Sequence, residues 1–178
     1  MTLNRRAFLG ASAATLAAPM VNAASHGTPK VVVIGGGAGG ATAARYIAKD
    51  SDGAIDVTLV EANPVYTTCY FSNLYLGDFR TLDSLQHGYE TLAQSGVTVV
   101  NDMATGLDRD AKTVTLAGGA VLPYDRLILS PGIDFVDGAV PGWDITQQHK
   151  MPHAYKAGSQ TELLKAQIEA MPEGGVFA

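Results

Sequence analysis

Cysteine is almost absent from this chain, whose 178 residues include only Cys69. One cysteine excludes an intrachain disulfide framework, a zinc site built from several cysteines and an iron–sulfur cluster held by this chain alone. It also excludes a Cys-x-x-Cys-His haem attachment, and we predict no metal site. Positive charge is scarce too, because 12 lysines and arginines stand against 17 acidic residues and the net charge is −5. This balance argues against nucleic-acid binding, which needs clustered lysine and arginine.

The chain also lacks an apolar run long enough for a stable membrane anchor, so we predict no membrane span. The nearest candidate is an alanine-rich run that ends at Val21, preceded by Arg5 and Arg6 and followed by small residues. A charged start, a short apolar run and a small-x-small site are typical of an export signal, and paired arginines indicate the twin-arginine type. We therefore expect residues 1–23 to be a signal for export to the periplasm and residues 24–29 to be a linker.

Glycine, in contrast, is abundant, with 20 residues in the chain. The densest cluster, 35–40, follows the β-branched run 30–34, which is typical of a buried parallel strand. Residues 41–48, which follow the cluster, are rich in alanine and favour a helix. Strand, glycine turn and helix in this order predict the start of a Rossmann-like α/β domain.

The glycine cluster contains the pattern Gly-x-Gly-x-x-Gly of dinucleotide-binding turns. Gly35 allows the tight turn, Gly37 lets a pyrophosphate approach the backbone, and Gly40 lets the helix pack closely on the strand. The N-terminus of the helix then offers free N–H groups and the positive end of its dipole to the phosphates. The predicted phosphate-binding residues are Gly35, Gly36, Gly37, Ala38, Gly39 and Gly40.

A second apolar strand, 55–60, ends at Glu61, at about the ~20-residue spacing expected for an acid that binds ribose hydroxyls. We predict that Glu61 and Ala62 contact the dinucleotide. An acid at this place suits both NAD and FAD. A short NAD domain usually continues directly into a helix, whereas this chain enters the polar and aromatic loop 63–80 and then continues with a predicted helix, a hairpin and a distinctive strand end. That order resembles the flavoproteins with two dinucleotide-binding domains.

The remaining patterns predict alternating elements. They are an amphipathic helix over 81–95 that stops at Gly96, a strand over 97–100, a hairpin of 113–116 and 120–122 around Gly118 and Gly119, a strand over 124–129, a connection over 133–157, a helix over 161–170 and the beginning of an apolar strand over 174–178. We therefore expect a truncated chain. Residues 30–170 would form the N-terminal part of an FAD-binding domain and 171–178 the start of a following strand, with the second dinucleotide-type domain missing.

Four segments resemble the flavoprotein subunit of flavocytochrome c sulfide dehydrogenase. They are the glycine-rich segment 33–44, Tyr66-Thr67-Thr68-Cys69-Tyr70-Phe71-Ser72-Asn73, His87-Gly88-Tyr89 and the segment 152–161 that begins Pro-His-Ala. The resemblance implies an FAD-binding domain of the glutathione-reductase type, with a parallel sheet, helices and a β-hairpin or meander. It also implies a periplasmic enzyme that oxidises sulfide to sulfur or polysulfide and passes electrons from FAD to a separate haem c cytochrome subunit in a heterodimer.

By this resemblance, Cys69 carries covalently attached FAD through the 8α-methyl group of the flavin. A thiolate is the soft nucleophile that such a bond needs, although a lone cysteine can also be a small buried hydrophobic residue. The two cysteines of the family's redox disulfide are expected after residue 178. No catalytic residue is therefore assigned within the chain, and the chain alone is not expected to oxidise sulfide.

The resemblance implies further cofactor contacts, each with a turn or core role as the alternative. They are Ser130, Pro131 and Gly132 beside the FAD, Met103 and Ala104 near the adenine, and Asn73 near the flavin. His87 and His153 belong to the shared segments, but we assign them no chemical role.

Three other interpretations remain open from the sequence. One is an NAD(P)H-dependent FAD disulfide reductase or peroxidase-like enzyme, in which Cys69 is a redox thiol. The second is an inactive truncated fragment that binds FAD poorly. The third is a sulfide:quinone reductase, a class closely related to the sulfide dehydrogenases.

Overall fold

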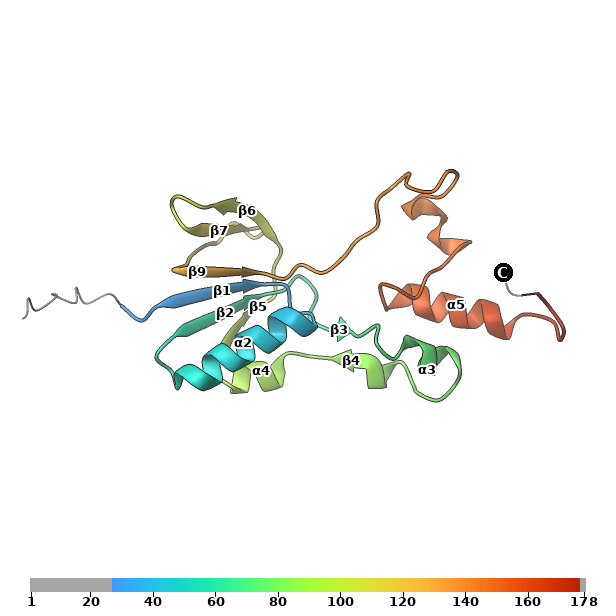
Figure 1. The fold of residues 1–178 in the computed structure, drawn as a ribbon, viewed down its shortest axis with the longest axis horizontal. Helices are drawn as coiled ribbons and strands as arrows, with labels where there is room; N and C mark the ends of the chain where they lie inside the picture. Colours follow the sequence, from blue (N-terminus) through green and yellow to red (C-terminus); the bar gives the residue numbers. More distant parts are fainter. Residues whose placement is uncertain (1–26, 177–178) are drawn as a thin grey trace, which may run out of the picture.

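The computed structural model describes residues 27–176, so the predicted export signal lies outside the described residues (Figure 1). Its centre is a parallel sheet of four strands. In spatial order these are β5 (Val97–Val100), β2 (Asp56–Val60), β1 (Lys30–Ile34) and β9 (Arg126–Leu129). All neighbouring strands in this sheet are parallel. The α/β fold with a parallel sheet is therefore confirmed.

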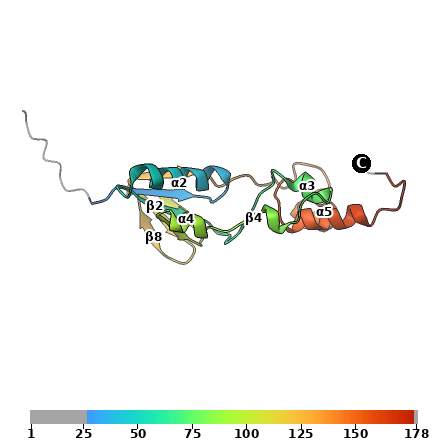
Figure 2. The ribbon, with the colours of Figure 1, turned by 90° about the horizontal axis from the view of Figure 1, so that it is seen from below.

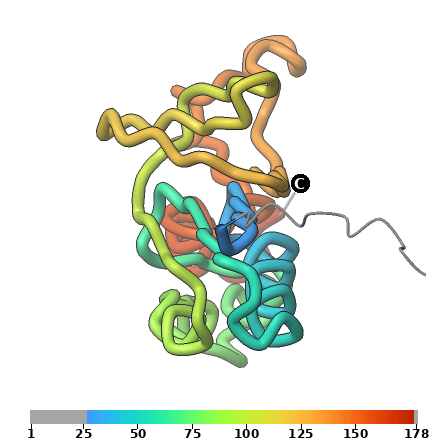
Figure 3. Tube along the Cα trace, turned by 90° about the vertical axis from the view of Figure 1, so that its left-hand side faces the viewer, coloured from blue at the N-terminus to red at the C-terminus, as the bar shows by residue number. Residues whose placement is uncertain are grey.

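The sheet is covered differently on its two faces. The helices α2 (Ala38–Ser51) and α4 (Glu90–Gln94) lie on one face. An antiparallel sheet of β6 (Ala104–Asp108), β7 (Thr113–Leu116) and β8 (Val121–Pro123) lies on the other. Figures 2 and 3 show these layers from two further directions. The arrangement agrees with the predicted sheet, helices and β-meander.

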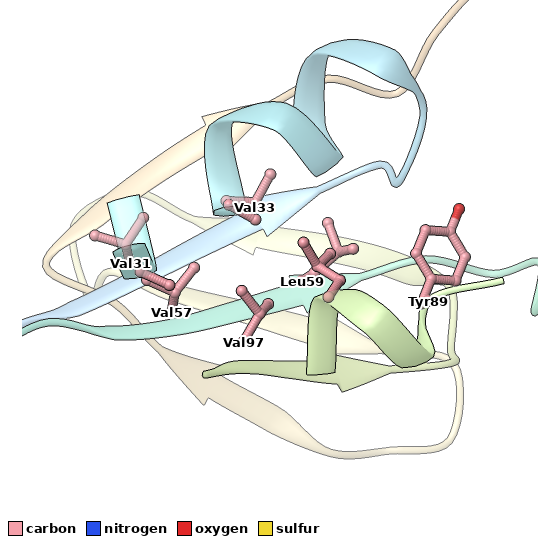
Figure 4. Packing of buried hydrophobic residues seen from close by; sticks show 9 residues of the cluster. Val31, Val33, Val57, Leu59, Tyr89 and Val97 are labelled. Carbon is pink, nitrogen blue, oxygen red and sulfur yellow. The ribbon is translucent and has the colours of Figure 1, made fainter. Parts of the chain in front are cut away.

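Alternation along β1 explains the layers, because successive side chains of a strand point to opposite faces. Val31 and Val33 pack in the helix-side cluster with Val57 and Leu59 (Figure 4). Val32, which lies between the first two, packs instead against the antiparallel sheet. Burying each side chain of this size stabilises the fold by about 1.5–3 kcal/mol.

The predicted hairpin is confirmed as the β7–β8 pair. Its turn contains Gly119, whose φ of +87° falls where side chains are disfavoured. The turn is closed by a hydrogen bond of 2.8 Å from the N–H of Leu116 to the carbonyl of Ala120. The strands predicted over 97–100 and 124–129 are also confirmed, as β5 and β9.

The single helix predicted over 81–95 is wrong. The structure has a 3-10 turn, η1 (Asp83–Leu85), then the short strand β4 (Gln86–His87), and only then α4. β4 pairs with β3 (Tyr66–Thr67), and this pairing takes residues 86–87 out of a helix. Leu85 and Leu92 are both buried, but Leu85 lies in η1 and Leu92 in α4. The apolar residues whose spacing predicted one helix therefore belong to two separate elements.

The last predicted helix is confirmed as α5 (Ser159–Glu169). It contacts α3 (Ser72–Leu76), which follows the Cys69 loop (Figure 1).

The connection before α5 contains one 3-10 helix, η2 (Ile145–His149). The strand predicted over 174–178 is absent from residues 174–176, where the N–H of Gly175 donates instead to the carbonyl of Pro172. Residues 177–178 lie outside the described part of the chain. Within residues 27–176, no helix combines the length and apolarity needed to cross a membrane.

Candidate dinucleotide-binding site

The turn between β1 and α2 needs glycine at two of its positions for steric reasons. Gly35 has a φ of +99°, and a Cβ there would collide with the carbonyl oxygen of Ser130. A Cβ on Gly40 would collide with the carbonyl oxygen of Gly35. Gly35 and Gly40 thus let strand, turn and helix approach one another closely, as the sequence pattern predicts.

Gly37 faces a different environment. It precedes the first residue of α2, and a Cβ there would meet only the ring of Tyr66, at 3.7 Å. Because Gly37 has no side chain, no side-chain cap covers the first N–H groups of α2. Uncapped amides at the positive end of a helix of 14 residues form a surface suited to a pyrophosphate.

Glu61 is fixed directly after β2 by backbone donors. Its carboxylate accepts hydrogen bonds from the N–H of Gly36 at 2.7 Å and from the N–H of Asn63 at 2.9 Å. The side-chain amide of Asn63 donates a further bond at 3.3 Å. A carboxylate offers about four acceptor positions, so Glu61 retains capacity for a ribose hydroxyl.

Tyr89, which we did not predict to belong to the site, contacts the same turn. Its buried hydroxyl donates to the carbonyl of Gly36 at 3.0 Å. Burial, assisted by the negative charge of Glu61 and by Tyr66, raises the pKa of Tyr89 to about 12. The phenol is therefore a stable donor at neutral pH. The only signal in the sequence was that Tyr89 belongs to the shared segment 87–89.

A cleft of about 780 Å³ opens beside the glycine turn. It is bounded by the turn, the end of β2, the Cys69 loop, the segment after β9 and the start of α5. The predicted cofactor-binding residues that line it are Gly37, Ala38, Gly39, Glu61, Cys69, Ser130, Pro131 and Gly132. The structure thus brings residues from four separate parts of the sequence to one cavity.

The other predicted contacts do not line this cleft. Gly35 and Gly40 line neither this cleft nor the smaller cavity of about 270 Å³, which Gly36 lines on the side of α4. Ala62 is exposed after Glu61, Asn73 lies in α3, and Met103 and Ala104 lie at the start of β6. Cofactor contacts by Ala62, Asn73, Met103 and Ala104 stay predictions.

Cys69 lies in the loop between β3 and α3, and its side chain is exposed. The interpretation as a small buried hydrophobic residue is therefore wrong. The loop is anchored on both sides of the cysteine, because the N–H of Thr68 donates to the carbonyl of Leu85 at 2.9 Å and the carbonyl of Cys69 accepts from Ser72 at 3.2 Å. A held, accessible thiol in the cleft is placed to react with a bound ligand.

The two histidines of the shared segments occupy different places. His153 lines the main cleft and packs on Phe135, with ring centroids 4.3 Å apart. Burial, and to a lesser extent the positive charge of Lys156, lowers the pKa of His153. His87 is exposed in β4 and lines the smaller cavity. Trp143 also packs on Phe135, with ring centroids 5.5 Å apart.

Residues 29–168 match the family model described as pyridine nucleotide-disulphide oxidoreductase. The chain belongs to this family. Among curated relatives, it is similar to the flavoprotein chain of sulfide dehydrogenase [flavocytochrome c] from Chlorobaculum thiosulfatiphilum. The two are 55% identical over 47 residues, which are 26% of this chain and 96% of that sequence.

Two further relatives of this oxidoreductase chain come from Aquifex aeolicus. A sulfide-quinone reductase of strain VF5 is 33% identical over 110 residues, covering 61% of this chain and 25% of the relative. The solved sulfide:quinone oxidoreductase superposes with a TM-score of 0.62 at 24% identity, over 80% of this chain and 33% of that one. This superposition supports the fold. The chain spans only about a quarter to a third of these two longer relatives.

Proposed function

We propose that this chain is part of a flavoprotein that binds FAD in the cleft, oxidises sulfide to sulfur or polysulfide and passes the electrons to a haem c cytochrome subunit. One observation carries the proposal: the exposed thiol of Cys69 lines the same cleft as the glycine turn and Glu61. The names of the flavocytochrome c flavoprotein chain and the sulfide-quinone reductase support sulfide as the substrate.

The residues of the cleft fit FAD as cofactor. The amides of Gly37, Ala38 and Gly39 would hold the pyrophosphate, and the remaining acceptor position of Glu61 would take a ribose hydroxyl. Ser130, Pro131 and Gly132 form another wall of the cleft. Bound FAD would supply a two-electron acceptor that can return electrons one at a time to a haem.

Cys69 would hold the cofactor through a thioether to the 8α-methyl group of the flavin. Forming this bond would break the S–H bond and one C–H bond of the methyl group, and the two electrons released would reduce the flavin, from which the proposed cytochrome would take them. Because Cys69 is exposed, its sulfur is accessible to a ligand in the cleft, and its thiolate form would be the nucleophile for this bond. The bond consumes the thiol, so Cys69 cannot also take up sulfide sulfur. No second cysteine occurs in the 178 residues, so a redox disulfide cannot form within them, and we propose that these residues alone do not oxidise sulfide.

Export by a twin-arginine signal and a periplasmic site of action belong to the same proposal. The support is the sequence pattern around Arg5 and Arg6. A covalent bond would retain the cofactor in a compartment where lost FAD is not easily replaced. The proposed partner is a haem c subunit in a heterodimer.

The test uses the full-length gene product, purified without oxygen and with its flavin oxidised. Sulfide and NADH are added to separate samples, and the flavin absorbance is followed. The proposal predicts rapid bleaching by sulfide, recovery of colour on adding oxidised cytochrome c, and little response to NADH. Bleaching by NADH with no response to sulfide would contradict it.

One alternative is favoured by a specific observation. An exposed Cys69 in the cleft also suits an NAD(P)H-dependent FAD disulfide reductase or peroxidase-like enzyme, in which the thiol itself is oxidised and reduced. Bleaching by NADH would select this alternative. An inactive truncated fragment is a further candidate, and failure of the 178-residue chain to retain flavin when it is expressed alone would favour it.

A further inference from the structure

Tyr89 and Gly36 are fitted to each other. The hydroxyl of Tyr89 donates to the carbonyl of Gly36 at 3.0 Å, and the bond is buried. A Cβ on Gly36 would collide with this hydroxyl and would lie 2.7 and 2.8 Å from two ring carbons of Tyr89. The Gly-x-Gly pattern does not require glycine at its middle position, which is Gly36 here. In this chain the ring of Tyr89 leaves no room for a side chain at that position.

The peptide groups on both sides of Gly36 are held by partners from distant sequence. Its N–H donates to the carboxylate of Glu61 at 2.7 Å. Its carbonyl accepts from Tyr89, which lies 53 residues further along the chain. The backbone at Gly36 is therefore fixed by one bond from the end of β2 and another from the start of α4.

Peptide geometry transmits this fixation to Gly37. The peptide bond between Gly36 and Gly37 is planar and trans, so its C=O and N–H point in opposite directions. Drawing the carbonyl of Gly36 toward Tyr89 turns the N–H of Gly37 to the other side. Gly37 lines both the smaller cavity and the main cleft, and in the main cleft its amide would meet a pyrophosphate.

The side chain of Tyr89 is held in place by its packing. It is 8% exposed and packs in the helix-side cluster with Leu59 and Leu92. Figure 4 shows its ring at the end of the cluster toward which the arrows of β1 and β2 point. The glycine turn lies at the same end, directly after β1.

We propose that Tyr89 is a positioning residue of the pyrophosphate site, which orients the Gly36–Gly37 peptide so that the N–H of Gly37 faces the bound cofactor. The inference rests on the proposed function only as far as FAD binding. It does not depend on sulfide, the cytochrome or the bond to Cys69.

The test uses the full-length protein with Cys69→Ser, so that FAD exchanges freely. FAD binding is measured by quenching of flavin fluorescence, and the ³¹P resonances of the bound pyrophosphate are recorded. Tyr89→Phe keeps the ring and removes the hydroxyl. We expect it to raise the Kd for FAD about 3- to 10-fold, as for loss of one buried hydrogen bond, and to shift a ³¹P resonance.

Tyr124→Phe is the matched control, because its hydroxyl also donates to a backbone carbonyl, that of Asp108 at 3.5 Å, but lies outside both cavities. We expect this variant to keep the parent Kd and the parent ³¹P spectrum. If Tyr89→Phe matches Tyr124→Phe in both measurements, the positioning role is overturned. If the Cys69→Ser parent and the wild type both lack FAD, the FAD assignment fails, and the role of Tyr89 fails with it.

A double-mutant cycle gives a second test that does not depend on Tyr89→Phe folding normally. Gly36→Ala should weaken FAD binding about 10-fold or more while the tyrosine ring is present, because the new methyl group collides with it. In a Tyr89→Leu background the same substitution should weaken binding much less. Equal effects in the two backgrounds would overturn the proposed coupling.

Discussion

The carboxylate of Glu61, directly after β2, accepts a hydrogen bond of 2.7 Å from the backbone N–H of Gly36 in the turn after β1. The acid that sequence analysis assigned to ribose binding thus also stabilises the glycine turn. Both groups lie at the carboxyl ends of adjacent parallel strands, where ligands bind in open α/β sheets. In the proposed function, this one side chain would couple the integrity of the turn to the binding of FAD.

Replacing Glu61 should destabilise the fold even without ligand. Glu61→Ala leaves the part-buried N–H of Gly36 without its acceptor, and a buried donor left unpaired costs about 1–3 kcal/mol. The exposed amides of Asn63 can bond water instead, so their loss adds little. We expect a loss of at least ~1 kcal/mol in urea unfolding, and a smaller loss for Glu61→Gln, which keeps one acceptor oxygen. The exposed control Glu173→Ala should stay within ~0.5 kcal/mol of wild type. A Glu61→Ala variant as stable as this control would contradict the account.

Tyr89 should make the fold sensitive to strong alkali. Its pKa is raised from 10.0 to about 12 in the folded protein, so the folded state keeps a proton that the unfolded chain loses in this range. Its contribution to stability is then complete below pH 10 and is lost as the pH rises toward 12. The difference in unfolding midpoint between wild type and Tyr89→Phe should shrink over this range. A difference that stays constant with pH would contradict the raised pKa.

His153 should remain neutral at pH 7. Burial, with the like charge of Lys156 as the smaller cause, holds its pKa below the usual value of 6.5. We expect the NMR titration midpoint of its ring to lie below 6.5 and to rise partway in Lys156→Met. Its contribution to stability is present above 6.5 and is lost as the pH falls through the lowered pKa. A midpoint at or above 6.5 in the wild type would contradict the placement of the ring beside the cleft.

Lys165 should hold the segment after Cys69 in place. Its ammonium pairs with Asp78, lies 3.7 Å from Glu169 and sits 4.6 Å from the ring centre of Tyr75. We expect Lys165→Ala to speed amide hydrogen exchange in residues 69–78, because α5 then loses its ion pair with Asp78, just after α3, and its contact with Tyr75 in α3. Lys156→Ala is the control, since Lys156 pairs with Asp134 at 3.2 Å in another segment. Equal exchange of residues 69–78 in both variants would show that Lys165 does not brace this loop.

The central fold could be predicted because its residues carry local and repeated signals. The β-branched run 30–34, the glycine cluster and the strand that ends at Glu61 each specify their own conformation, and together they specify a parallel pair. Gly119 likewise marked the β7–β8 turn, since few other residues adopt its positive φ.

The parts that failed depend on contacts between distant segments. Apolar spacing over 81–95 fits one helix, but β4 within it pairs with β3, about 20 residues earlier in the chain. In the sequence, Tyr89 lies at the three- and four-residue spacing expected of the buried face of a helix. Nothing in the neighbouring sequence indicates that its hydroxyl reaches Gly36. Such roles arise only when the sheet brings the two segments together.

The most direct test of the account is to locate the flavin on the chain. The full-length protein is purified, digested and examined by mass spectrometry for the peptide that contains Cys69, with Cys69→Ala as the control. The account predicts that this peptide carries FAD through the cysteine, and that acid precipitation leaves the yellow colour in the wild-type pellet and removes it from the variant. An unmodified Cys69 peptide, with all flavin released by acid, would contradict covalent attachment and would favour a redox thiol at this position.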